Sequence, residues 1–249
     1  MAVTEARAEL PDARHPLTAA YDALWDAAEP EVRRGRVALD EVVLCKEGDA
    51  RRGVTLLARP GAAVAAGLAA FLDELRTLEP GQYYQPLADL HLTVLSLFTA
   101  TADYRPYLTH LGAYRAAVAE ALDGAAPFAV DVAGVTLSPG AVLAQGFPRG
   151  DTLARVRERL RAALAARGLG GALDRRYRLE TAHMTVVRFA APLRDPGRFV
   201  DALAAARGRA FGTAAVAEVE LLLGDWYQSA ERARLTRRYR LTGAAPNGA

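Results

Sequence analysis

The sequence HLTVLSLF at residues 91–98 is echoed by HMTVVRF at residues 183–189. Each run begins with a histidine, has a threonine two positions later and ends in a phenylalanine. Apolar and β-branched residues dominate both runs, a composition typical of strands. We therefore expect two similar strands, each of which follows a helical stretch.

Residues two apart on a strand point to the same face of the sheet. His91 and Thr93 should therefore project together, and so should His183 and Thr185. If the two strands lie close together, one site contains two imidazoles and two hydroxyls in approximate twofold symmetry.

This set of side chains suits phosphodiester chemistry. A neutral histidine can accept a proton from an attacking hydroxyl or water, and a protonated one can donate a proton to the leaving oxygen. An unperturbed imidazole pKa of about 6.5 suits both tasks. Threonine hydroxyls can donate hydrogen bonds to the charged non-bridging oxygens of the phosphate. No metal is required by this scheme.

The chain has only four histidines, and two of them stand in these matched contexts. A single His-x-Thr carries little weight, whereas a matched pair is hard to attribute to chance. We expect His15 and His110 to be surface or helix-terminal residues. A metal site at His91 and His183 would need carboxylates on the same strand faces, and neither motif has one.

The surrounding sequence alternates irregularly between helical and strand patterns, with a hairpin in the middle. This order predicts an α+β fold with mainly antiparallel sheet. Pro30 is expected to end the first helix, and Asp151 and Gly168 to cap the fourth. Helices are expected over 17–28, 62–78, 105–122, 152–167 and 196–205, and strands over 41–45, 54–58, 90–98, 128–137, 142–147, 182–189, 216–223 and 235–241.

The composition is that of an ordinary globular protein. The net charge of +2 gives no strong electrostatic attraction to long nucleic acids or membranes. Lys46 is the only lysine, so any chemistry that needs a nucleophilic lysine must use it. A single cysteine, Cys45, excludes an intrachain disulfide and is compatible with a reducing cytosol. No signal peptide or membrane span is evident. We expect a cytoplasmic protein with no obligate protein partner, in which residues 1–50 form an N-terminal extension and residues 51–249 one domain.

The paired motifs resemble the signature of the 2H phosphoesterase superfamily, whose members include proteins named as 2′-5′ RNA ligases and RNA 2′,3′-cyclic phosphodiesterases. The resemblance covers roughly residues 53–245. It implies two similar lobes of mainly antiparallel sheet flanked by helices, arranged around a central cleft with one motif in each lobe. It also implies that His91, Thr93, His183 and Thr185 are catalytic, that no cofactor is needed, and that the substrates are RNA ends or small nucleotides with a cyclic phosphate.

Many members of this superfamily have an arginine soon after a His-x-Thr motif. Here Arg188 follows His183 by five residues, and Ser96 occupies the equivalent place after His91. On a regular strand Arg188 would face away from His183, and only a bulge or the strand end would turn it inward. Arg188 is therefore a candidate phosphate ligand only if a bulge or the strand end turns it toward His183.

Aromatic residues near the motifs are candidates for stacking on a base. Tyr84 precedes the first motif, and Tyr227 lies in a stretch that we expect to form a loop over the site. Tyr83 and Trp226 are expected to be ordinary boundary residues instead.

The sequence thus predicts a metal-independent phosphodiesterase that hydrolyses 2′,3′-cyclic phosphates or related RNA-type diesters. Two alternatives stay open. One is 2′-5′ ligation, in which an RNA hydroxyl replaces water and no adenylation is needed. The other is a non-catalytic module that binds RNA ends or nucleotides. The stretch Lys46-Glu47-Gly48-Asp49 does not have the residue order of the ATP-dependent ligase motif.

Overall fold

The computed structural model describes residues 15–173 and 179–244. Its strands form two antiparallel sheets, one with the order β3-β1-β8-β9 and the other with the order β2-β6-β5-β4-β7. The α+β class and the antiparallel pairing predicted from the sequence are confirmed. The strands are β1 (Arg52–Ala58), β2 (Tyr83–Tyr84), β3 (Leu92–Thr101), β4 (Phe128–Ser138), β5 (Ala141–Pro148), β6 (Met184–Arg188), β7 (Ala210–Val216), β8 (Glu218–Gly224) and β9 (Arg234–Arg240).

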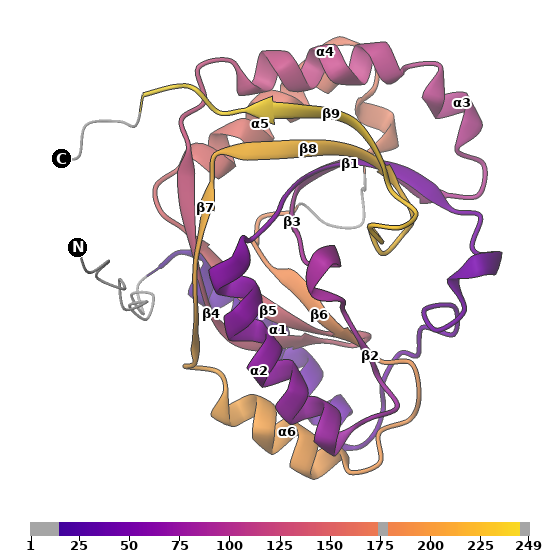
Figure 1. Ribbon diagram of the computed structural model, residues 1–249, viewed down its shortest axis with the longest axis vertical. Coiled ribbons are helices and arrows are strands. Elements are labelled where there is room, and N and C mark those ends of the chain that lie inside the picture. Colours follow the sequence, from indigo (N-terminus) through magenta and orange to yellow (C-terminus); the bar gives the residue numbers. More distant parts are fainter. Residues whose placement is uncertain (1–14, 174–178, 245–249) are drawn as a thin grey trace.

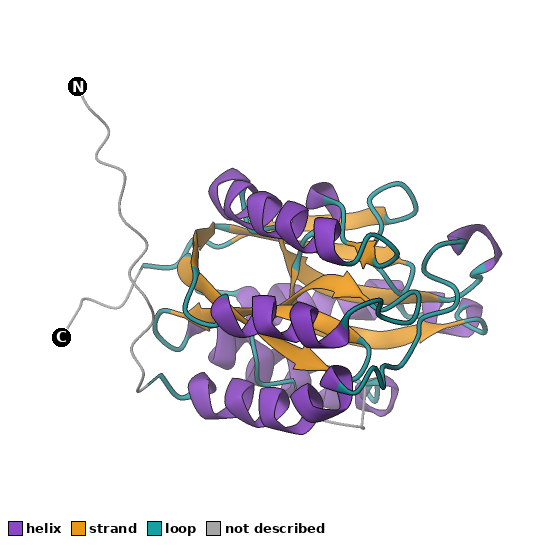
Figure 2. Cartoon of the chain, turned by 90° about the horizontal axis from the view of Figure 1, so that it is seen from below, coloured by secondary structure: helices purple, strands orange, loops and turns teal. Residues whose placement is uncertain are grey.

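Helices flank both sheets (Figure 2). The first lobe consists of the four-stranded sheet with α3, α4 and α5, and the second consists of the five-stranded sheet with α1, α2 and α6 (Figure 1). Within the described ranges, no helix is long and apolar enough to cross a bilayer. The helices are α1 (Leu17–Arg33), α2 (Ala62–Leu78), α3 (Arg105–Leu108), α4 (Leu111–Leu122), α5 (Thr152–Ala166) and α6 (Pro196–Ala205), with short 3₁₀ turns at Lys46–Gly48, Leu87–Asp89 and Gly170–Ala172.

Helix α2 packs through the apolar face that its sequence pattern predicts. Its predicted apolar face is buried, and the helix lies against β7. The approach is close enough that a Cβ atom at Gly67 would lie 2.3 Å from the carbonyl oxygen of Phe211. Glycine is therefore required at this contact. The buried residues of the face are Val64, Leu68, Phe71, Leu72 and Leu75.

The prediction that Pro30 ends the first helix is wrong, because α1 runs on to Arg33 with Pro30 inside it. Proline removes one backbone hydrogen bond from a helix interior and strains the turn before it. Here Val32 is fully buried, and its packing holds the last turn in place.

The same helix reaches the second His-x-Thr motif. The Tyr21 hydroxyl donates to the carbonyl oxygen of Gly146 at 3.0 Å and accepts from the backbone N–H of Ala182 at 3.0 Å. Ala182 directly precedes His183, so α1 helps to place that motif. Residues 17–33 therefore pack as part of the second lobe, and the domain boundary at residue 50 stays a prediction.

Three other expected elements differ from the structure. Residues 41–44 form a turn, not a strand; Val43 packs into the interior, whereas Leu44 is 66% exposed. The helix expected over 105–122 is broken into α3 and α4. The strand expected over 216–223 is β8, and it begins at Glu218. Strand β7 was missed, because its alanines and Gly212 give a weak strand signal.

Candidate active site

The two His-x-Thr motifs line one cavity of about 570 Å³. His91 lies directly before β3, at the edge of the four-stranded sheet, and His183 lies directly before β6, in the other sheet. Thr93 and Thr185 line the same cavity. Figure 1 shows β3 and β6 in the middle of the molecule, between the two groups of helices. The structure thus brings together the four residues that sequence pairing singled out.

Strand β3 contains a bulge just after the first motif. The adjacent residues Leu57 and Leu56 of β1 pair with Thr93 and Leu95, so Val94 is an extra residue on β3. An extra residue shifts the alternation of side chains that follow it.

Strand β6 has the same irregularity at the equivalent place. Leu143 and Val142 of β5 pair with Thr185 and Val187, which leaves Val186 as the extra residue. Each bulge therefore falls three residues after its histidine.

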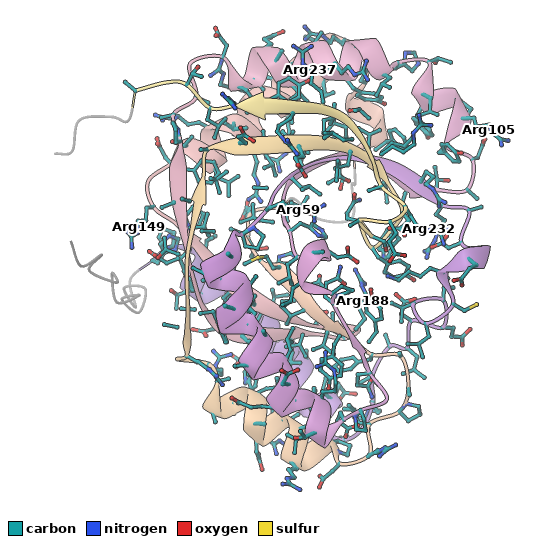
Figure 3. The ribbon with its side chains drawn as sticks, in the orientation of Figure 1. Arg59, Arg105, Arg149, Arg188, Arg232 and Arg237 are labelled. Carbon is teal, nitrogen blue, oxygen red and sulfur yellow. The ribbon has the colours of Figure 1, made fainter. Side chains whose placement is uncertain are left out.

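The paired bulges decide the position of Arg188. Both Ser96 and Arg188, five residues after His91 and His183, line the cavity. Arg188 is thus turned toward the site, as it must be if it is to act as a phosphate ligand. Its Nε atom is buried and has no hydrogen-bond partner among the described residues, and its Nη1 atom lies 3.9 Å from Asp40. Figure 3 shows Arg188 near the middle of the molecule, whereas Arg105 and Arg149 lie at its outer edge.

Neighbouring oxygen atoms orient both imidazoles. His91 Nδ1 lies 2.7 Å from the carbonyl oxygen of Asp89, which can only accept, so Nδ1 carries the proton and Nε2 is the nitrogen available for proton transfer. His183 Nδ1 lies 2.8 Å from the Thr181 hydroxyl, which can donate or accept. The neutral tautomer of His91 is therefore fixed, and that of His183 can change.

Both imidazoles favour the neutral form in the ligand-free protein. Burial, together with the charges of Arg59 and Arg188, lowers the pKa of His91 to about 4 against the opposing effect of the Asp89 carbonyl. Burial also lowers the pKa of His183 to about 4, with added contributions from the charge of Arg157 and from His91. The effect of His91 on the pKa of His183 is consistent with their common position on the cavity wall.

Arg157 on α5 connects the two motifs, and nothing in the sequence indicated it. Its guanidinium donates to four backbone carbonyl oxygens at 2.8–3.0 Å. Two belong to Thr93 and Val94 of β3, and two belong to Glu180 and Thr181, just before His183. The side chain is 3% exposed, and burial lowers its pKa to about 10. One arginine thus holds the two motif segments at a fixed separation.

The aromatic candidates take different positions from those expected. The Tyr84 hydroxyl donates to the carbonyl oxygen of Glu79, and Tyr227 is 1% exposed with its hydroxyl bonded to Asp40. Neither lines the cavity, so the prediction that they stack on a base is not supported. Trp226, which was expected to be a boundary residue, does line it. In the loop after β8, the residues on either side of it, Asp225 and Tyr227, are buried, whereas Trp226 is only partly buried.

This loop has a defined backbone. The buried carboxylate of Asp225 accepts from the backbone N–H groups of Tyr227 and Ser229 at 3.0 Å. Gln228 adopts a φ of 55°, a conformation that non-glycine residues rarely take and that clusters at functional sites. Its side-chain amide donates to the Thr55 hydroxyl at 3.2 Å, and both residues line the cavity.

Two other kinds of site find no support in the structure. Among the described residues, no group of three or more histidine, cysteine, aspartate or glutamate side chains is placed to hold a metal ion. Lys46 does not line the cavity; its ammonium donates to Tyr83 at 2.5 Å and Ser229 at 3.0 Å, and burial lowers its pKa. Its position therefore gives no basis for a covalent role.

The fold matches solved structures of low sequence identity. TT0787 of Thermus thermophilus is 18% identical, with a TM-score of 0.57 over 78% of this chain and 100% of that one. E. coli LigT complexed with 3′-AMP is 16% identical, with a TM-score of 0.52 over 77% of this chain and 99% of that one. A structure described as a phosphoesterase has 16% identity and a TM-score of 0.51 over 77% and 99% of the two chains. No protein-family model and no curated protein sequence matches the chain. The chain therefore has the bilobal α+β fold of these structures, which is the fold that its resemblance to the 2H phosphoesterases implies.

Proposed function

We propose that this protein is a metal-independent phosphodiesterase that opens 2′,3′-cyclic phosphates or related RNA-type diesters by two-histidine acid–base catalysis. The observation that carries the proposal is the convergence of His91 and His183 on one cavity. Each is followed by a threonine on the same wall and by a bulge that brings a fifth residue, Ser96 or Arg188, to that wall.

The proposed reaction is a substitution at phosphorus. Water attacks the phosphorus, a new P–O bond forms, and the bond from phosphorus to the 2′ or 3′ oxygen breaks. One imidazole accepts the proton of the water, and the other donates a proton to the departing oxygen. Thr93, Thr185 and Arg188 hydrogen bond to the non-bridging oxygens, where charge is held in the transition state. The product is a nucleoside phosphomonoester, and exchange with solvent restores the starting protonation of both histidines.

The surroundings of the two imidazoles suggest which role each takes. The carbonyl oxygen of Asp89 favours a proton on His91, and the bare Nε2 of its neutral form is what a general base requires. The charge of Arg157 favours loss of a proton from the imidazolium of His183. We therefore assign His91 as the base and His183 as the acid. A bound phosphate supplies the negative charge that favours protonation of His183.

The substrate class rests partly on the comparisons. LigT, which has the same fold, was solved with 3′-AMP. A nucleoside 3′-phosphate is one of the two products that opening a 2′,3′-cyclic phosphate would give. The single exposed cysteine, Cys45, fits a cytoplasmic location, where thiols stay reduced.

The test is hydrolysis of 2′,3′-cyclic AMP, and of a short RNA that ends in this group, in the presence of EDTA. We expect wild type to open the ring, and His91→Ala and His183→Ala each to lose activity by about 10² or more. His110→Ala is the matched control, because His110 is exposed and does not line the cavity. Dependence on added metal, or full activity in either motif variant, would contradict the proposal. Binding without turnover would identify a binding module, and joined RNA products a ligase.

A further inference from the structure

A second cavity, of about 460 Å³, adjoins the histidine cavity. Arg188 and Trp226 line both cavities, so they form a shared wall. The remaining walls come from residues 38–42, from Arg51 and from the turn between β4 and β5. Both volumes lie in the range of small-molecule sites, about 300–1,000 Å³. The histidine cavity alone is therefore large enough for one nucleotide, and the second cavity is additional space beside it.

The segment 38–42 is fixed in place, although it has no regular secondary structure. The backbone N–H of Asp40 donates to the carbonyl oxygen of Phe189 at 2.8 Å, and that of Ala38 donates to Pro139 at 2.8 Å. The Asp40 carboxylate accepts from the Tyr227 hydroxyl at 2.8 Å. These bonds join the segment to the end of β6 and to the loop that carries Trp226.

The walls combine small and aliphatic side chains and the Trp226 ring with charged side chains of both signs. Leu39 is 41% exposed and Val42 is 37% exposed, and both line this cavity. The Arg51 guanidinium lies 5.4 Å from the centre of the Trp226 ring and is paired with Asp49, so its charge is largely compensated. Asp40 and Glu41 also line the cavity.

This chemistry fits a nucleobase better than a phosphate. A base is a flat ring that stacks on aromatic and guanidinium surfaces, and its N–H groups can donate to carboxylates. Asp40 and Glu41 disfavour a phosphate in the second cavity, whereas the motif histidines and threonines line only the cavity on the other side of Arg188. The phosphate therefore belongs on the histidine side of Arg188, and a base on the other side.

We propose that the second cavity binds the base of the nucleotide adjacent to the one whose phosphate reacts. This inference rests on the proposed function, and it makes an oligonucleotide, not a mononucleotide, the preferred substrate. Residues 38–42, which lie in the predicted N-terminal extension, then determine specificity for chain length.

The test compares a dinucleotide with a mononucleotide, both ending in a 2′,3′-cyclic phosphate. We expect kcat/KM to be roughly tenfold higher for the dinucleotide, in line with one stacked base. Leu39→Asn should remove most of this preference and leave the mononucleotide rate unchanged. The matched control is Leu235→Asn, because Leu235 is 51% exposed and lines neither cavity. Equal rates for the two substrates, or equal losses on both in Leu39→Asn, would overturn the subsite while the proposed function stands.

A binding measurement separates the subsite from catalysis. Trp25→Phe leaves Trp226 as the only tryptophan, so its fluorescence reports on the shared wall. We expect adenylyl-(3′→5′)-adenosine 3′-phosphate to bind roughly tenfold more tightly than adenosine 3′-phosphate and to change this emission. The difference should disappear in Leu39→Asn and persist in Leu235→Asn. If neither cyclic substrate is hydrolysed but this pattern is found, the subsite stands and the proposed function fails. Equal affinity for the two ligands would overturn the subsite.

Discussion

Burial and nearby guanidinium groups keep His91 and His183 neutral at neutral pH, with the pKa of each near 4. Acid–base catalysis nevertheless needs one imidazolium. A phosphate anion in the cavity places a negative charge beside both rings and raises their pKa, because an opposite charge favours the protonated form. In the proposed mechanism, the substrate itself therefore creates the acid.

Proton uptake on ligand binding follows from this coupling. We expect wild type to take up a proton when it binds 3′-AMP near pH 6.5, and the His183→Gln variant to take up less. Titration calorimetry in two buffers of different ionisation enthalpy measures the uptake directly. Identical binding enthalpies for wild type in both buffers would show that neither histidine changes its charge.

At the scale of elements, the site depends on two bulged strands and on one helix that holds them together. The bulges at Val94 and Val186 turn Ser96 and Arg188 toward the cavity. Arg157 on α5 then fixes the two strand starts relative to each other through four carbonyl oxygens. Displacements of about 1 Å can cost a hundredfold in rate.

Arg157→Met should therefore lower kcat by at least about tenfold and leave KM for the cyclic substrate nearly unchanged. The reason is that the motifs lose their separation while the groups that bind phosphate remain. We also expect a loss of about 1–3 kcal/mol in unfolding free energy from the carbonyl groups left unpaired. Arg159→Met is the control, because Arg159 on the same helix also donates to two carbonyls, those of Asp123 and Glu120, away from the motifs. A similar fall in kcat in both variants would show that Arg157 has only a structural role.

Packing of α2 on β7 gives a second prediction at this scale. Gly67→Ala should destabilise the protein, because overpacking against the Phe211 carbonyl, at about 1–3 kcal/mol, outweighs the helix-propensity gain of up to about 1 kcal/mol. Gly112→Ala in α4 meets no atom within 4 Å and should stabilise it by about 0.5–1 kcal/mol. Urea unfolding compares the two. Stabilisation by both would mean that α2 can move away from β7 at little cost.

The elements that could be predicted from the sequence are those that local sequence signals specify. The helix at 62–78, the hairpin of β4 and β5 and the two motif strands were predictable because periodicity and turn residues specify them. The bulge in β6 was foreseen only as a condition on Arg188, and the bulge in β3 was not foreseen, because an extra residue is visible only in the pairing with a neighbouring strand. Arg157 was not foreseen at all, because its partners are backbone carbonyls 23–64 residues away, and these leave no mark in the sequence.

At the scale of the whole molecule, the two lobes are interlocked. The chain passes from β1 in the first lobe to α2 in the second, and from β7 in the second back to β8 in the first (Figure 1). Tyr21 and Arg157, from opposite lobes, both contact the backbone just before His183. Assembly of the site and folding of the chain are therefore one process.

The pH dependence of stability should report this coupling. Each histidine has a folded pKa near 4 and an unfolded pKa near 6.5, so between these values the unfolded chain binds more protons. Stability should fall as the pH drops through this range, by up to about 1.4 kcal/mol per pH unit for each histidine. Urea unfolding at pH 7, 6, 5 and 4 should show a shallower decline for the His91→Gln/His183→Gln variant. Parallel declines would mean that the imidazoles are protonated as readily in the folded state as in the unfolded chain.

The decisive experiment for the paired mechanism compares the rates of 2′,3′-cyclic AMP hydrolysis in EDTA by wild type, His91→Ala, His183→Ala and the double variant. Two residues that act as one acid–base unit show strongly non-additive losses. We predict that each single variant loses a factor of about 10² or more and that the double variant is no slower than the worse single one. Losses that multiply in the double variant would show that the two histidines act independently, and the paired mechanism would then be wrong.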